Sequence, residues 1–322
     1  MRAIAAAGPG GRLIDVEVPR PALREHDALV AVEAVSINPA DVKLAERTTS
    51  RSRILGFDAV GTVIELGPSA TGFAVGDEVY YAGDITRQGA NADYHAVDTR
   101  LIAHRPMSLT VAEAAALPLT TITAWESLFT HLSVNRETTG DLVVVGAAGG
   151  VGSMVIQLAK LSTALRVVGT ASRPESEAWA AKMGADELVD PRDLVKGVKS
   201  IAPLGVDAVF SSYSSGNIRH FAEILKPFGH IVAIDDGHLD LSPLKAKSIT
   251  WHWEYMFTHS TQKTPQMSSQ GELLRGVASL VDAGMLRSTL TTEIQDFTAA
   301  GIQRAHDLVA TSTTVGKVVV RR

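Results

Sequence analysis

Four glycines lie at the point where a run of β-branched residues gives way to a helical pattern. The segment Val143–Lys160 reads VVVGAAGGVGSMVIQLAK. A glycine turn that leads into a helix N-terminus directs backbone N–H groups and the positive end of the helix dipole toward one point, and this arrangement binds anions. The residues that we expect to contact such an anion are Gly149, Gly150, Val151 and Gly152.

The spacing of these glycines is close to the fingerprint G-x-G-x-x-G of dinucleotide-binding turns. Gly149 matches the second glycine, which lets the chain approach a pyrophosphate, and Gly152 matches the third, which lets the helix pack on the strand. Ala147 occupies the first position, where a methyl group is tolerated if the turn does not need a positive φ. A glycine-rich turn without a ligand is the alternative interpretation of this motif alone.

A second candidate site follows the next predicted strand. NAD-binding sites place an acidic residue about twenty positions after the glycine motif to hold the ribose 2′-hydroxyl group. Here Ser172 and Arg173 stand at that strand end instead. A hydroxyl group and a guanidinium suit a 2′-phosphate, because arginine offers a rigid fork of donors. The pair favours NADP(H) over NAD(H), and the alternative is an ordinary solvated loop arginine.

The elements that must position these residues are strands that alternate with helices. We expect strands at 142–146, 166–169, 207–210 and 230–234, and helices at 151–161, 175–183 and 217–225. Such alternation builds βαβ units and a parallel sheet, whose ligands bind outside the carboxyl ends of the strands. Ser212 and Ile234 end two of these strands, and we expect both to contact the cofactor.

The first hundred residues have a different pattern, with short β-branched runs separated by turns, such as Leu13–Val18, Ala28–Val35 and Ala59–Leu66. This spacing predicts a small, partly closed all-β domain. A helix at 270–282 and a final strand at Lys317–Val320 follow the α/β region. We expect that final strand to return to the first domain.

The composition excludes several classes of function. The chain of 322 residues has a formal net charge of −5 and no run of five or more like charges, which argues against nucleic acid or an anionic membrane as its partner. Its apolar stretches are shorter than a membrane span and its N-terminus runs into a strand pattern, so we expect a cytoplasmic protein. It has no cysteine, which excludes disulfides, thiol catalysis and thiolate zinc sites, and its ten histidines form no H-x-x-x-H pair.

Motifs along nearly the whole chain together resemble the medium-chain dehydrogenase/reductase superfamily, and specifically its zinc-independent, quinone-oxidoreductase-like branch. A further run, Lys247–Thr258 (KSITWHWEYMFT), is similar to bacterial members named zinc-type alcohol dehydrogenase-like. In that branch alanine often replaces the first glycine of the fingerprint. The motifs that carry the resemblance are Ser36–Lys43, Leu55–Val63, Gly76–Val79, Ala115–Trp125, Gly146–Gly152, Gly169–Arg173 and Val315–Val319.

The resemblance implies an α/β fold of two domains, with a cleft between them where nicotinamide meets substrate. A GroES-like β-barrel domain would take residues 1–112 and be completed by 265–322, and a Rossmann domain with a doubly wound parallel sheet would take 113–264. Homodimers joined by edge strands of the two Rossmann sheets are also implied. Zinc-dependent relatives hold their metal with Cys, His and Cys, and the matching positions here are Asn38, Phe57 and Leu119, so we expect no zinc.

The resemblance also indicates which residues act on the substrate. Asn38 would contact the substrate oxygen, Asp41 and Lys43 would organise the surrounding loop, and Thr123 would lie beside the nicotinamide. Lys317 would approach the nicotinamide end of the cofactor. The plainer alternatives are a turn at Asn38, a structural ion pair between Asp41 and Lys43, a helix hydroxyl bonded to its own backbone at Thr123, and a surface lysine at Lys317.

Two sets of aromatic residues remain open. Tyr80, Tyr81, Tyr94 and Tyr255 are proton donors or, more simply, packing residues. Trp251, Trp253 and Phe257 form either a wall for a flat substrate or part of an interface, and we favour the interface.

Without a metal, the reaction that needs least assistance is hydride delivery from NADPH to a carbon that is already electrophilic. A quinone or an α,β-unsaturated carbonyl compound fits, because the anion that forms is delocalised. We therefore expect an NADPH-dependent, metal-free reductase of quinones or enones. The alternatives are a broader alkenal or carbonyl reductase, and a protein that binds NADPH for a structural or regulatory role without turnover.

Overall fold

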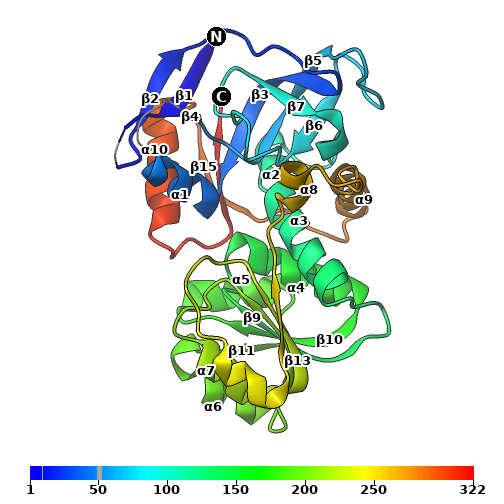
Figure 1. The fold of residues 1–322 in the computed structure, drawn as a ribbon, viewed down its shortest axis with the longest axis vertical. Helices are drawn as coiled ribbons and strands as arrows, with labels where there is room; N and C mark the ends of the chain where they lie inside the picture. The colour runs from blue at the N-terminus through cyan, green and yellow to red at the C-terminus, as the bar shows by residue number, and fades with distance from the viewer. Residues whose placement is uncertain (9, 49–52) are drawn as a thin grey trace. The chain divides into compact units, whose positions relative to one another are not determined.

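The computed structural model describes residues 1–8, 10–48 and 53–322. They form two compact units, one made of Met1–Ile122 with Phe257–Arg322 and the other of Thr123–Met256 (Figure 1). The first boundary lies later than the expected 112/113, because α2 (Val111–Ala115) packs against strands of the first unit. The second lies earlier than 264/265, because Phe257 is buried on first-unit residues.

The first unit is built on two sheets of mostly antiparallel strands. The larger sheet is seven-stranded with the order β15-β16-β3-β5-β6-β8, and β7 also pairs with β3. The smaller is three-stranded with the order β2-β1-β4. Strand β3 (Asp27–Ile37) is the centre of the larger sheet, since β5, β7 and β16 all pair with it. The final strand, β16 (Lys317–Arg321), returns to this unit as the sequence predicts.

The remaining elements of the first unit are β1 (Arg2–Ala6), β2 (Leu13–Glu17), α1 (Pro39–Arg47), β4 (Arg53–Ile54), β5 (Ala59–Leu66), β6 (Glu78–Tyr81), β7 (Tyr94–Asp98), η1 (Thr99–Leu101), β8 (Ile102–His104), α8 (Thr258–Gln262), α9 (Ser269–Asp282), β15 (Leu290–Ile294) and α10 (Ala299–Ala310). Helix α3 (Pro118–Trp125) begins in the first unit and ends in the second.

The second unit contains a six-stranded sheet with the order β11-β10-β9-β12-β13-β14, and every recorded pairing in it is parallel. Its central strand, β9 (Thr139–Val145), ends in four consecutive buried residues, the pattern of a parallel strand covered on both faces. Helices α4 and α5 pack on each other, as do α6 and α7. This is the α/β fold with a doubly wound parallel sheet that the sequence predicts.

The remaining elements of the second unit are η2 (Glu126–His131), α4 (Gly150–Ser162), β10 (Ala164–Thr170), α5 (Pro174–Met183), β11 (Glu187–Val189), η3 (Pro191–Asp193), α6 (Leu194–Ile201), β12 (Val206–Ser211), α7 (Ile218–Ile224), β13 (Leu225–Ala233), η4 (Ser242–Lys247) and β14 (Thr250–Trp253). Within the described part of the chain, no helix combines the length and the apolar character that crossing a membrane requires.

Candidate functional site

The glycine turn follows β9 and begins α4. Gly146 has φ +83°, in the left-handed region that favours glycine, and Gly149 is the N-cap of α4, with its N–H donating to Gly146 O at 3.0 Å. Helix α4 starts at Gly150 and runs for 13 residues, and its first backbone N–H groups have no partner within the helix. Such geometry is suited to binding a phosphate group.

The glycines of this turn are needed for different reasons. A Cβ atom on Gly152 would lie 2.3 Å from Gly146 O, so only glycine lets α4 pack this closely on the turn. A Cβ atom on Gly149 would meet its nearest protein atom at 3.4 Å, so protein packing does not explain that glycine. The positive φ belongs to Gly146 and not to Ala147, and this is why alanine is tolerated at the first fingerprint position.

Ser172 and Arg173 follow β10, the strand that pairs with β9. The end of β10 is tied to the glycine turn, because Gly146 N–H donates to Thr170 Oγ1 at 3.1 Å. Both residues are exposed, and Arg173 is the N-cap of α5, with its N–H donating to Ser176 Oγ at 3.2 Å. Arg173 therefore stands at a second helix N-terminus, one strand away from the glycine turn.

Ser212 and Ile234 lie at the ends of β12 and β13. Ser212 N–H donates to Val145 O at 3.3 Å, and Ile234 N–H donates to the Ser211 carbonyl oxygen at 3.1 Å. Because the strands are parallel, their carboxyl ends share one edge of the sheet, where ligands of such sheets bind. The structure thus brings the predicted cofactor residues of the second unit to one edge.

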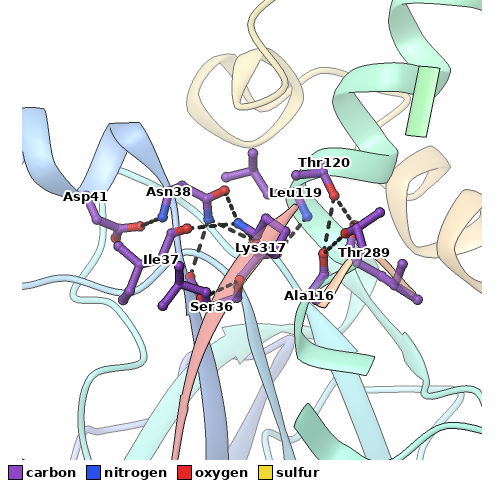
Figure 2. Close-up of polar contacts among 12 residues, drawn as sticks. Ser36, Ile37, Asn38, Asp41, Ala116, Leu119, Thr120, Thr289 and Lys317 are labelled. Carbon is purple, nitrogen blue, oxygen red and sulfur yellow. Dashed lines mark hydrogen bonds and ion pairs between the residues drawn. The ribbon is translucent and has the colours of Figure 1, made fainter. Parts of the chain in front are cut away.

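Lys317 belongs to a buried polar cluster in the first unit (Figure 2). It is 4% exposed, and its ammonium donates to Ile37 O at 3.0 Å, Asn38 Oδ1 at 2.5 Å and Asp58 Oδ2 at 3.2 Å. An ammonium has three donors, so all of them are used. The surface-lysine alternative is wrong, and the predicted cofactor contact would require one of these bonds to break.

Asn38 lies in the same cluster with its side-chain amide fully engaged. It is 2% exposed, and Nδ2 donates to Asp58 Oδ2 at 2.8 Å and to Ser36 O at 3.4 Å while Oδ1 accepts from Lys317. A bond from Asn38 to a substrate oxygen would have to replace one of these contacts. In this structure Asn38 connects the buried charges and also serves as the N-cap of α1.

Two buried aspartates accompany the lysine. Asp41 accepts from the N–H groups of Asn38 and Gly56, each at 2.9 Å, and so fixes the backbone of the loop. Burial raises the pKa of both Asp41 and Asp58 to about 6, against the opposing effect of the Lys317 charge and of their hydrogen bonds. Burial also lowers the pKa of Lys317, and Asp58 opposes that shift.

The positions that match zinc ligands in metal-binding relatives do not suit zinc in this chain. Asn38, Phe57 and Leu119 offer neither a thiolate nor an imidazole. The Asp58 carboxylate accepts from Leu119 N–H at 2.7 Å and from the Lys317 ammonium, so a dication would face a buried positive charge. Nor does the described part of the chain contain any cluster of three or more His, Cys, Asp or Glu residues able to hold a metal ion.

The other two predicted substrate-side residues belong to different units. Lys43 is half-buried in α1 of the first unit, and Thr123 is 5% exposed in the second unit. Two tyrosines are packing residues with satisfied hydroxyl groups. The Tyr80 hydroxyl donates to Leu274 O at 2.5 Å, and the Tyr81 hydroxyl is hydrogen-bonded to Nδ1 of the buried His95 at 3.1 Å.

The three aromatic residues proposed as a wall or an interface, Trp251, Trp253 and Phe257, do not form one wall within either unit. Trp251 and Trp253 contact each other in the second unit, with ring centroids 5.2 Å apart, and Trp253 is 51% exposed. Phe257 belongs to the first unit, where its ring packs edge-on against Phe57 at 5.7 Å.

Two polar groups near these sites were not expected from the sequence. Asn91 is fully buried, and neither side-chain amide atom has a hydrogen-bond partner in the structure. Glu254 is buried at the end of β14, beside His131. Asn91 lies in a loop after Gly89 and Glu254 in an aromatic-rich run, and a single polar residue in either place has no spacing pattern that would mark it.

Comparisons with known proteins agree with both halves of this fold. Residues 24–115 match the model of the alcohol dehydrogenase GroES-like domain, and residues 150–268 match the model named zinc-binding dehydrogenase. A zinc-type alcohol dehydrogenase-like protein of Staphylococcus aureus (strain COL) is 38% identical over 321 residues, which cover 96% of this chain and 95% of that protein.

Two more distant relatives carry enzyme names. The 2-methylene-furan-3-one reductase of Solanum lycopersicum is 28% identical, over 95% of this chain and 74% of that protein. The quinone oxidoreductase of Lama guanicoe is also 28% identical, over 99% of this chain and 97% of that protein.

Solved structures are similar over the whole chain. A protein of Rhizobium etli CFN 42, provisionally named a zinc-dependent alcohol dehydrogenase, has a TM-score of 0.95 and 40% identity, covering 100% of this chain and 98% of its own. A mycobacterial protein solved in complex with NADPH has a TM-score of 0.87 and 25% identity, with both chains covered completely at 100%.

Proposed function

This chain belongs to the medium-chain dehydrogenase/reductase superfamily, and from that premise we propose that it is an NADPH-dependent oxidoreductase that reduces quinones or α,β-unsaturated carbonyl compounds without a catalytic metal. That the chain is an oxidoreductase of this superfamily follows from its relatives. The cofactor, the substrate class and the absence of zinc are our proposal.

The choice of NADPH rests on one observation: two helix N-termini lie at the same edge of the sheet. The turn at Gly146–Gly152 would hold the pyrophosphate, since its N-terminal N–H groups have no helical partner. Arg173, at the N-terminus of α5 on the neighbouring strand, would take the 2′-phosphate. The mycobacterial neighbour with NADPH bound supports this choice.

The buried cluster of the first unit supports a reaction without a metal. Lys317 supplies a fixed positive charge beside Asp58, and it leaves no ligand set for zinc. Nicotinamide supplies the hydride when it is bound, so the chain itself must bind, orient and exclude water. An enone or quinone needs only hydrogen-bond donors near its oxygen and a proton, because the charge that develops there is delocalised.

The names of two relatives support the substrate class. One is a reductase of a methylene-furanone and the other a quinone oxidoreductase, and both act on conjugated carbonyl compounds by name.

We extend the proposal to a cytoplasmic homodimer. The edge strand β14 pairs with β13 alone among the described strands, and its Trp253 is half-exposed, so a second copy is the partner we propose for it.

An acceptor screen tests the proposal. Purified protein, treated with a chelator and shown by metal analysis to hold no zinc, is mixed with NADPH and a panel of quinones, enones, alkenals and simple ketones. We expect NADPH oxidation with quinones or enones and little with simple ketones. Tight NADPH binding without oxidation by any acceptor would indicate a binding protein, and activity that returns only with zinc would contradict the metal-free reaction.

A further inference from the structure

A hydrogen-bond relay of three residues in the second unit joins the two helices that begin at the proposed cofactor sites. Trp179 lies on α5, and its indole Nε1 donates to Ser153 Oγ on α4 at 2.8 Å. The Ser153 hydroxyl in turn donates to Gly149 O, the carbonyl oxygen of the N-cap of α4, at 2.7 Å. Neither Trp179 nor Ser153 has a part in the function proposed above.

The chemistry of the three groups fixes the direction of this relay. An indole N–H can only donate and a carbonyl oxygen can only accept, whereas a hydroxyl has one proton to donate and two lone pairs that accept. The Ser153 oxygen therefore accepts from Trp179, and its own proton goes to Gly149 O. The Ser153 backbone N–H also donates to Gly149 O, at 2.9 Å, so the start of α4 keeps this bond when the hydroxyl is removed.

Helices α4 and α5 lie side by side and run in the same direction. Trp179 meets α4 at Ser153, in its first turn. Further along, a Cβ atom on Gly184, the C-cap of α5, would lie 3.4 Å from Lys160 Cγ, near the end of α4. Both N-termini therefore open on the same edge of the sheet, and a shift of α5 along α4 would move Arg173 relative to the glycine turn.

The Trp179 ring is also held from its own helix. Lys182, three residues later in α5, places its Nζ atom 5.4 Å from the centroid of the indole, which is a cation–π contact. The ring itself is half-buried, whereas Ser153 is 0% exposed. A phenyl ring at position 179 would keep the packing and the contact with Lys182, and it would lose only the N–H that reaches α4.

We propose that Trp179 is a positioning residue for NADPH: through the Ser153 hydroxyl it holds the N-terminus of α5, and with it Arg173, at the separation from the glycine turn that one NADPH molecule spans. The inference rests on the proposed NADPH site. NADH has no 2′-phosphate, so its binding depends on the turn and not on the placement of α5. Trp179 therefore acts through Arg173 and contributes to the preference for NADPH over NADH.

Trp179→Phe removes the indole N–H alone and tests this role. The net contribution of one hydrogen bond corresponds to roughly a two- to ten-fold change in an equilibrium constant. A smaller fraction of molecules then has α5 correctly placed, and the apparent dissociation constant rises by the inverse of that fraction, so W179F should weaken NADPH binding about five-fold. NADH binding should change less than about two-fold in the same fluorescence titrations. Ser153→Ala should have the same effect, and the double variant should bind no more weakly than either single variant.

Trp251→Phe is the matched control. Trp251 lies in the same unit, and its buried indole N–H has no hydrogen-bond partner among the described residues, so W251F should leave both dissociation constants within about two-fold of wild type.

The second comparison repeats W179F in the Arg173→Ala background. There it should change NADPH binding less than about two-fold, because the two residues act on one contact. No effect of W179F on NADPH, equal weakening of NADPH and NADH, or a five-fold effect that persists in R173A would each overturn the proposal, and Trp179 would then be a packing residue.

Hydrogen exchange without cofactor distinguishes a failure of this proposal from a failure of the proposed function. In W179F and in S153A, residues 174–180 at the start of α5 should exchange at least about two-fold faster than in wild type, while α7 stays unchanged. Equal exchange in all three proteins would refute the relay, whether or not NADPH binds. Faster exchange in the variants, together with a wild-type protein that does not bind NADPH or an R173A variant that binds it normally, would refute the proposed NADPH site and with it the positioning role.

Discussion

Replacing Lys317 with methionine tests the buried cluster of the first unit most severely. Methionine keeps much of the volume of the lysine stem but removes the charge and its three hydrogen bonds. Asp58 and Asp41 would then be buried without a cation. Removing one partner of a buried ion pair costs about 3–5 kcal/mol, so we expect K317M to lower the free energy of unfolding by about that amount at pH 8.

The effect should depend on pH in a defined direction. The folded-state pKa of Asp41 and of Asp58 is raised from 3.8 to about 6, so their favourable contribution is complete below pH 3.8 and is lost as the pH rises to about 6. Without Lys317 the pKa values of both aspartates rise further, and each additional pKa unit lowers the free energy of unfolding at high pH by about 1.4 kcal/mol. The pH range over which stability falls then extends further above pH 6. K317M should therefore lose at least about 1.4 kcal/mol more at pH 8 than at pH 5.

Unfolding monitored by calorimetry and by urea titration at pH 5 and pH 8 measures this difference. Lys245→Met, at an exposed lysine, is the matched control and should change stability by less than about 0.5 kcal/mol. The double variant K317M/D58N should recover part of the loss at pH 8, because it removes the unpaired carboxylate. A loss below about 1 kcal/mol at pH 8, or no recovery in the double variant, would refute the reasoning.

Three further predictions concern the cofactor and the metal. Arg173→Ala should weaken NADPH binding at least ten-fold and NADH binding less than two-fold in fluorescence titrations, and equal losses would exclude a role in binding the 2′-phosphate. Gly149→Ala should weaken NADPH binding with little change in melting temperature, whereas Gly152→Ala, whose Cβ would lie 2.3 Å from Gly146 O, should lower both; if the two variants behave alike, we have misassigned the two glycines. Adding zinc to chelator-treated protein should leave both NADPH oxidation and melting temperature unchanged, and a rise in either with stoichiometric zinc would show a metal site.

Local sequence patterns predicted the fold of the second unit well. The β-branched run before Gly146, the glycine spacing and the strand–helix alternation each fix structure over a few residues, and β9, the turn and α4 form as expected. The role of Gly146 was missed because the fingerprint counts glycines, while the turn needs a positive φ one residue before the fingerprint's first position.

The buried cluster was harder to predict because its members lie far apart in the sequence. Asp58 and Lys317 are 259 positions apart and meet only because β16 pairs with β3. A signal was present, since each is a single charged residue in an apolar run, Phe57–Val60 and Val315–Val320, and such a charge needs a partner when the run is buried. Sequence reasoning treated Lys317 as a cofactor or surface residue because it did not pair these two runs.

The π-helix η2 lies beyond what sequence patterns reveal. A helix over 118–131 with ordinary periodicity would separate Glu126 from His131, and nothing in the local sequence marks the change from α3 to η2. Glu254, which His131 contacts, comes from a strand end more than a hundred residues later. Such a feature depends on tertiary packing, which periodicity does not encode.

The most direct test of the central claim is isotope transfer by the metal-free protein. Chelator-treated protein is supplied with NADPH deuterated at nicotinamide C4, in separate samples for each face of the ring, together with a simple enone, and the product is analysed by mass spectrometry and NMR. We predict deuterium at the β-carbon of the reduced enone from one face only, a proton from water at the α-carbon, and zinc well below one atom per chain. Product without deuterium from either face, or turnover that requires zinc, would contradict the account.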